Sequence, residues 1–103
     1  MTLKKFKSIL ESAGFPVTYR SWPESKAPPM PYICYYVSGS DNFAADGAVY
    51  YSVNQLQVEL YTELKEPETE AALETALASF YWNRTETYID TENCYQIAYE
   101  IEV

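Results

Sequence analysis

Apolar and polar side chains alternate most regularly at the end of the chain, so residues 94–103 predict a strand. Five large side chains share one face of it: Tyr95, Ile97, Tyr99, Ile101 and Val103. Residues 53–61 alternate in the same way. A period of two is that of a strand with one covered face. We therefore expect both segments in a sheet that is covered on one side.

Shorter β-rich segments predict the other strands, at residues 17–22, 32–38, 48–52 and 85–90. The second of these, YICYYVS, is almost continuously apolar, which is typical of a strand covered on both faces. Residues 48–52 run directly into residues 53–61, so two strands or one long bent strand both fit.

Two segments have the period of a helix. The first begins after Thr2, a good N-cap, and Gly14 is a stop signal. Its apolar positions are Leu3, Phe6, Leu10 and Ala13. The second begins at Pro67, which suits the first helical position, and is expected to end near Trp82. Its apolar positions are Leu73, Ala76, Leu77 and Phe80.

The resulting order is α-β-β-β-β-α-β-β, in one domain over residues 1–103. It predicts an α+β fold, with two helices packed on a mixed, mostly antiparallel sheet. The turn-rich segment Gly39–Gly47 is expected to be a loop between two long β segments. The loop and the β segments on either side of it would form a hairpin that can project from the body.

Composition argues against catalysis. The 103 residues include no His and only two Cys, so His-based catalytic and metal sites and a Cys₄ zinc site are excluded. Three scattered glycines make no phosphate-binding loop. Carboxylate pairs such as Glu59 with Glu63, or Glu100 with Glu102, are expected to be solvated. We expect no enzyme, no cofactor and no metal.

The net charge of −8 is unevenly distributed. Residues 1–26 carry five basic and two acidic residues, whereas residues 27–103 carry two basic and thirteen acidic ones. Lys4, Lys5 and Lys7 lie at the start of the first helix, where the macrodipole disfavours cations. This uneven charge is compatible with head-to-tail self-association. It is equally compatible with charged residues that simply lie on solvated surfaces. The three lysines are candidate interface residues, and specific nucleic-acid binding is not expected at this charge.

The eleven tyrosines fall almost entirely on predicted strands. Sheet packing accounts for many of them. The pairs Tyr35–Tyr36 and Tyr50–Tyr51 place Tyr on both faces of the sheet, however, and one small core cannot bury all of them. Since Tyr is enriched at protein interfaces, Tyr50 and Tyr51 are candidate contact residues. Phe43, in the expected loop, is another, although it could also fold under that loop.

The two cysteines, Cys34 and Cys94, are expected to be free and buried rather than disulfide-bonded, because the start of the chain is not typical of a secretion signal. No run of about 18 apolar residues predicts a membrane span.

Three parts of the sequence are distinctive: LKKFKSILES at the start, FPVTYRSWPE followed by PPMPYICYY, and the ending CYQIAYEIEV. Through them the chain resembles small tail proteins of siphoviruses and prophages of Gram-positive bacteria, near the tail completion and tail terminator families. The resemblance spans nearly all of the chain, and it implies a place in the host cytoplasm during assembly and then in the virion. The middle part is the most distinctive, and the pattern includes no catalytic signature.

The resemblance implies an α+β protein that assembles as a ring, commonly hexameric, and contacts tail tube and head connector proteins. It also implies that a long hairpin joins neighbouring subunits, for which Gly39–Gly47 is the natural segment. DNA would pass through such a ring without specific binding. Two alternatives remain: another head–tail connector or minor tail component, and a small acidic binding or inhibitor module that mimics DNA.

Overall fold

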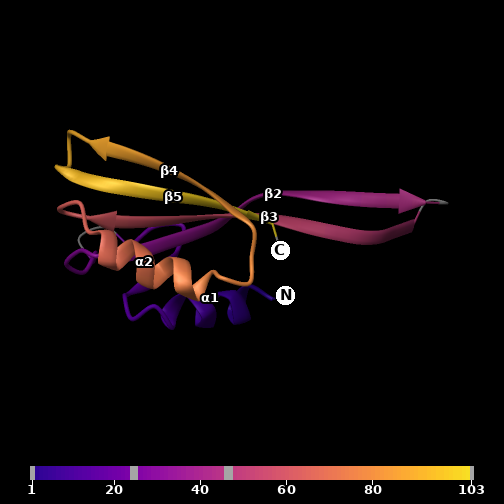
Figure 1. Ribbon diagram of the computed structural model, residues 1–103. Coiled ribbons are helices and arrows are strands. Elements are labelled where there is room, and N and C mark those ends of the chain that lie inside the picture. Colours follow the sequence, from indigo (N-terminus) through magenta and orange to yellow (C-terminus); the bar gives the residue numbers. More distant parts are fainter. Residues whose placement is uncertain (1, 24–25, 46–47, 103) are drawn as a thin grey trace.

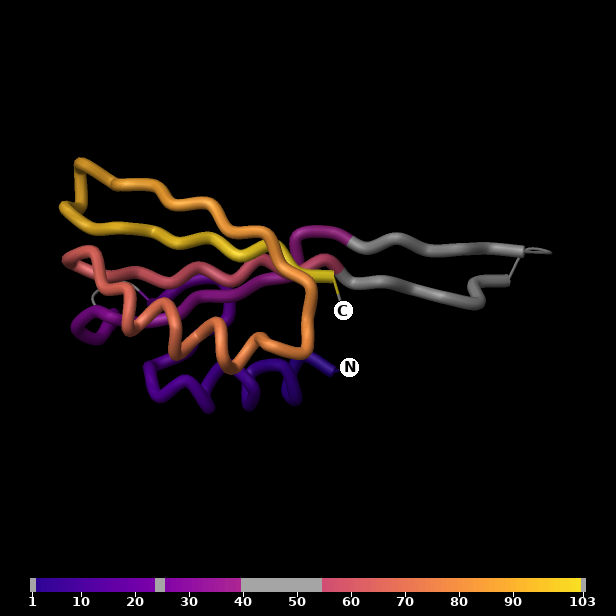
Figure 2. The backbone as a smooth tube through the Cα atoms, viewed as in Figure 1, coloured from indigo at the N-terminus to yellow at the C-terminus, as the bar shows by residue number. Residues whose placement is uncertain are grey.

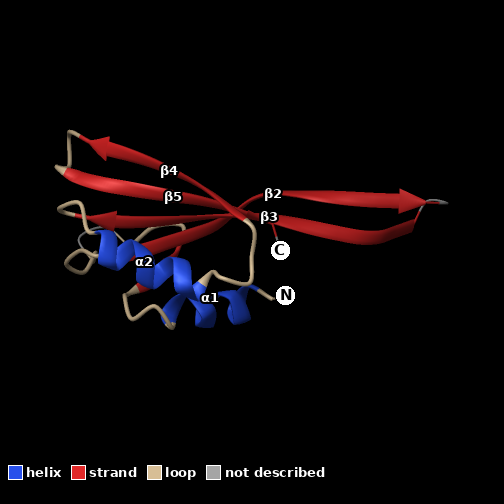
Figure 3. Ribbon diagram, viewed as in Figure 1, coloured by secondary structure: helices blue, strands red, loops and turns tan. Residues whose placement is uncertain are grey.

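One face of a five-stranded sheet carries both helices (Figure 1, Figure 3). The computed structural model describes residues 2–23, 26–45 and 48–102; within residues 40–45 and 48–54 it describes the backbone alone. Helices α1 and α2 span Leu3–Glu11 and Pro67–Ala76. The strands are β1 (Val17–Tyr19), β2 (Tyr32–Ala45), β3 (Ala48–Thr62), β4 (Trp82–Ile89) and β5 (Cys94–Glu102).

The sheet is mixed and mostly antiparallel, as expected. Its strand order is β1-β2-β3-β5-β4. Only β1 and β2 run parallel, and the other three pairs are antiparallel. Strands β3, β5 and β4 lie side by side in the body (Figure 2). The predicted α+β fold with two helices on the sheet is therefore confirmed.

The element order differs from the prediction by one strand, because residues 48–52 and 53–61 form the single strand β3. The expected loop Gly39–Gly47 is wrong over residues 39–45, since β2 continues as a strand to Ala45, and residues 46 and 47 lie outside the described residues. In residues 39–45 the pairing of β2 with β3 outweighs the turn propensity of the local sequence. Strand β1 is also shorter than predicted and ends at Tyr19, before Arg20 with φ 66°.

Helix α2 ends at Ala76 instead of near Trp82, and β4 begins at Trp82 instead of Thr85. The reason is packing in the core. Phe80 and Trp82 both pack against the buried cluster, and the Trp82 ring meets Tyr99 edge-on at 5.3 Å between centroids. A helix continued through these residues would not place both rings there. Tyr81, expected on the helix, is 94% exposed.

Helix α1 has the predicted beginning. The Thr2 hydroxyl accepts a hydrogen bond from the Lys5 backbone N–H at 3.1 Å, which confirms Thr2 as the N-cap. Gly14 beyond the helix adopts φ 97°, the left-handed conformation expected of a stop signal. Phe6 and Leu10 are fully buried and fix the helix to the sheet.

The core lies between the helices and the sheet. It combines α1, α2 and alternate positions of the three central strands. Its residues on these three strands are Ile33, Tyr35, Leu56, Val58, Leu60, Ile97, Tyr99 and Ile101, and Val17 of β1 joins them. The period-two faces predicted for β3 and β5 are therefore confirmed at the described positions, and Val103 lies outside them. The opposite face of the sheet, which we call the open face, carries no helix among the described residues.

The two cysteines are free and buried, as predicted. Cys34 alternates with Ile33 and Tyr35 and so points to the open face, where Trp22 and Tyr32 line the hollow beside it. The first part of β2 is thus covered on both sides, as its apolar sequence predicted. Burial, with a smaller contribution from the nearby Glu59, raises the pKa of the Cys34 thiol to about 11. The thiol is neutral at physiological pH, where it behaves as a small apolar side chain.

Candidate functional site

Strands β2 and β3 continue beyond the rest of the sheet as a two-stranded ribbon, residues 40–45 and 48–54 (Figure 1). Strand β5 pairs with β3 only as far as Gln55, and β1 pairs only with Ile33–Tyr35 of β2. In the described strand register, the ribbon therefore pairs only with itself. Both of its edges present backbone N–H and C=O groups to which another strand can bind.

A β-bulge at Ser38 and Gly39 joins the ribbon to the body. Val37 pairs with Leu56, but the next pair is Gly39 with Gln55, so Ser38 is the extra residue. The Ser38 hydroxyl donates to the Gln55 carbonyl at 3.0 Å. A side chain at Gly39 would meet the Gln55 amide oxygen at 3.2 Å, so glycine suits this close approach. A bulge bends the strand in which it lies, so this one can change the direction of β2 where the ribbon leaves the body.

The ribbon contains the three predicted aromatic contact residues. Phe43 is opposite Tyr51, and Tyr50 has no partner because the register shifts between Phe43 and Ala44. These three side chains lie outside what the structure describes, so their predicted contact role stays a prediction. The backbone nonetheless places all three on one ribbon beyond the body.

The three predicted lysines lie elsewhere, on the outer surface of α1. Lys4, Lys5 and Lys7 are exposed, and none forms an ion pair with another described residue. Lys5 lines a shallow groove of about 630 Å³ between α1 and α2. The structure therefore defines two separate candidate surfaces, one on α1 and one on the ribbon, and does not bring them together.

A third surface, the open face, contains a hydrogen-bonded group in which the sequence pointed only to Glu59, as a solvated carboxylate; it is in fact half-buried. The Glu59 carboxylate accepts hydrogen bonds from the Gln57 amide at 2.8 Å and the Tyr61 hydroxyl at 2.9 Å. The Gln96 amide in turn donates to the Tyr61 hydroxyl at 2.9 Å. Burial of Tyr61 raises the pKa of its hydroxyl, and the hydrogen bond to Glu59 adds to this rise. The alternation of β3 predicted these residues on one face, but only the pairing of β3 with β5 brings Gln96 beside them.

The open face also has a hollow at the base of the ribbon, with a volume of about 600 Å³. Glu100 and Glu102 of β5 line it, and both are exposed. Tyr81, the most exposed large aromatic residue in the described chain, lines the same hollow. Glu100 and Glu102 therefore lie in water on one face, as predicted, and Glu63 is exposed beyond the end of β3.

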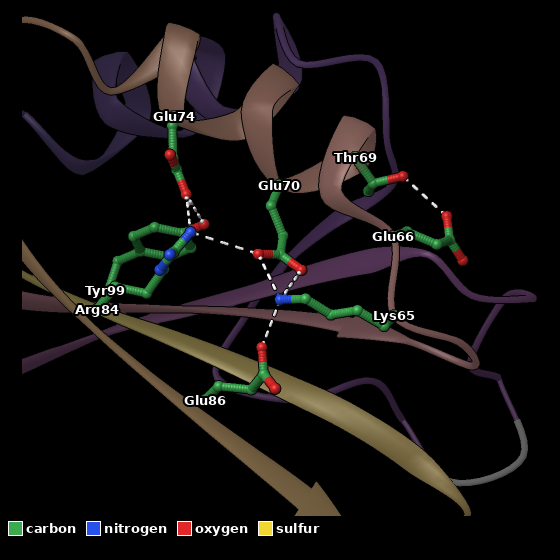
Figure 4. A network of polar contacts seen from close by, with 8 residues as sticks. All are labelled: Lys65, Glu66, Thr69, Glu70, Glu74, Arg84, Glu86 and Tyr99. Atoms are coloured by element: carbon green, nitrogen blue, oxygen red, sulfur yellow. Dashed lines mark hydrogen bonds and ion pairs between the residues drawn. The ribbon is translucent and has the colours of Figure 1, made fainter.

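The densest set of charged groups lies under α2 and is structural (Figure 4). The buried Glu70 carboxylate contacts the Lys65 ammonium at 2.7 Å and the Arg84 guanidinium at 3.3 Å. Lys65 also binds Glu86, and Arg84 binds Glu74 at 2.7 Å. Both cations thus have carboxylate partners, and hydrogen bonds to these partners raise the pKa values of Lys65 and Arg84. Glu70, Glu74 and Glu86 are therefore each bound by a cation.

Replacing both cations, as Lys65→Met with Arg84→Met, is expected to lower the free energy of unfolding by about 3 kcal/mol. Glu70 is only 3% exposed, so its charge would be left without a partner inside the protein. Adding Glu70→Gln to the double variant is expected to recover more than half of the loss. Urea unfolding measures both values, and exposed Glu68→Gln is the matched control. A loss below about 1 kcal/mol would mean that Glu70 is already solvated.

Among the described residues, no three His, Cys, Asp or Glu side chains are grouped so that they could hold a metal ion. Neither described helix is long and apolar enough to cross a membrane. No protein-family model matches the chain, and no curated protein is similar enough to count as a relative.

Proposed function

We propose that this chain is a phage structural protein that assembles with copies of itself, as a ring, at the tail end or the head–tail joint. The observation that carries the proposal is the ribbon, which extends from the body with two unpaired edges in the described register. An isolated two-stranded hairpin is marginally stable in water. A ribbon of this kind is best explained by a partner that pairs with it in the assembly.

The resemblance to tail completion and tail terminator proteins agrees with this geometry, because it implies a long hairpin between subunits. The partners proposed on that basis are other copies of the chain, tail tube proteins and head connector proteins. The chain would fold in the host cytoplasm and remain in the virion. No catalytic, cofactor-dependent or metal-dependent role is proposed.

The charge of the chain suits a ring through which DNA passes. Each Lys or Arg contact to phosphate adds affinity, so a lumen that lets DNA slide should carry few cations. With fifteen acidic and seven basic residues, the chain can supply such a surface. Specific binding to DNA is not proposed, and the lumen would act by repulsion.

Electron microscopy and sedimentation velocity of the purified chain, at high concentration and low salt, test the proposal. Rings with a central hole are the expected result. If the chain alone is a monomer, the same measurements are repeated with tail tubes of the phage that encodes it. A chain that neither forms rings nor binds those tubes contradicts the proposal. Binding to a DNA-processing enzyme in competition with DNA would instead support the acidic inhibitor module.

A further inference from the structure

The outer surface of α1 is basic and has no neutralising partner among the described residues. Lys4 and Lys5 lie in the first turn, where no acidic residue accompanies them and the macrodipole disfavours cations. Lys7 is one turn after Lys4, so the two ammonium groups can approach the same partner. The one acidic residue of the helix, Glu11, is at its other end. Because these lysines interact unfavourably with the helix macrodipole, we expect the basic surface to have an acidic partner.

The open face carries the complementary charge. Glu59, Glu100 and Glu102 lie on this face, since Glu59 pairs with Ala98 while Glu100 and Glu102 pair with Gln57 and Gln55. Neighbouring acids in this set are separated by about 7 Å, comparable to the spacing of lysines one turn apart. None of the three forms an ion pair within the described chain. Arg20 also lies on this face, with its guanidinium 5.2 Å from the centre of the Tyr36 ring.

The two surfaces lie on opposite sides of the same sheet. Phe6 and Leu10 attach α1 to the covered side, whereas Glu100 and Glu102 point to the open side. One copy therefore cannot bring its own lysines to its own acids. A contact between them joins two copies head to tail, and such a contact repeats until it closes into a ring or extends as a filament.

We infer that the α1 lysines of one copy bind the Glu59–Glu100–Glu102 surface of the next copy, an inference that rests on the proposed self-assembly. Tyr81 lines the hollow beside Glu100 and Glu102 and is exposed. Its ring offers apolar area to the methylene stem of an incoming lysine. The occupant of the open face is thus a second copy of this chain, oriented with α1 toward it.

Charge reversal on each side tests this contact. One variant carries Lys4→Glu with Lys7→Glu, and the other carries Glu100→Lys with Glu102→Lys; all four residues are exposed. Each variant alone is expected to self-associate at least about tenfold more weakly than the wild type at low salt. An equal mixture of the two, and the chain with all four changes, should associate as the wild type does. Glu63→Lys with Glu68→Lys, also exposed, raises the net charge as much as Glu100→Lys with Glu102→Lys does and should have little effect.

Carbodiimide cross-linking of the wild type supplies the second measurement, because it joins an ammonium to a carboxylate in direct contact. In an equal mixture of unlabelled and isotope-labelled chains, mass spectrometry should find mixed-label links from Lys4, Lys5 or Lys7 to Glu100 or Glu102. If the wild type assembles but both reversals leave assembly unchanged, the inference is wrong and the proposed function stands. If the wild type forms neither assemblies nor links between copies, even on tail tubes, both are wrong.

Discussion

A chain in which residues 40–54 are replaced by Asn-Gly is expected to fold like the wild type and to lose assembly. The replacement joins Gly39 to Gln55, which are already paired, through the commonest two-residue hairpin turn. The body keeps every core side chain that the structure describes, because none of these residues lies in the ribbon. The free energy of unfolding should therefore change by less than about 1 kcal/mol. Ring formation and tail tube binding should fall below detection.

Urea unfolding and electron microscopy check these two outcomes on the same sample. A shorter replacement provides the graded control: exchanging residues 43–51 for Asn-Gly joins Asn42 to Ser52, which are also paired, and leaves half of the ribbon. This variant should assemble weakly. Full ring formation by the chain that lacks residues 40–54 would show that the ribbon has no part in assembly.

The second large effect is expected from Phe6→Ala, which should lower the free energy of unfolding by about 3–5 kcal/mol. The Phe6 ring is fully buried, with its centroid 5.6 Å from that of Phe80 and 6.0 Å from that of Tyr35. The ring thus connects α1 to the segment after α2 and to β2. A nine-residue helix does not persist alone in water, so α1 depends on this contact and on Leu10.

Hydrogen exchange followed by mass spectrometry distinguishes two ways in which Phe6→Ala can act. If only α1 detaches, exchange rises in residues 3–11 and the sheet stays protected. If the whole body unfolds, protection falls in β3 and β5 together. Phe6→Leu keeps most of the apolar volume and is the conservative control. A change in unfolding free energy below about 1 kcal/mol for Phe6→Ala would contradict the packing described for this ring.

Signals that act over a few residues were sufficient to predict part of this fold. Thr2 caps α1 through the amide three residues later, and the alternation of β5 lies within nine consecutive residues. Both features depend on local spacing, so the sequence displays them directly. The start of β4 does not, because Trp82 is a strand residue on account of Tyr99, seventeen positions further along. The helix propensity of the alanines before it pointed to a longer helix.

Of the three candidate surfaces, two were predicted from the sequence and one was not. The lysines of α1 and the aromatic residues of the ribbon were recognised from composition, since charge and ring content are visible in any sequence. The open face was not, because its hydrogen bonds join strands far apart in the chain: Gln96 donates to Tyr61, thirty-five residues away. Ser40, Asp41 and Asn42 have low strand propensity, so only their pairing with β3 makes them part of a strand.

The bulge at Ser38 also shifts the register between β2 and β3. Before it, odd-numbered residues of β2 pair with even-numbered residues of β3, as Val37 does with Leu56; after it, even pairs with even, as Ser40 does with Asn54. Beyond this point the ribbon can gain or lose residue pairs without turning any body side chain to the wrong face. Adding two residues to each of the two strands would lengthen the ribbon by about 7 Å. The distance that the ribbon spans can therefore evolve independently of the body that holds it.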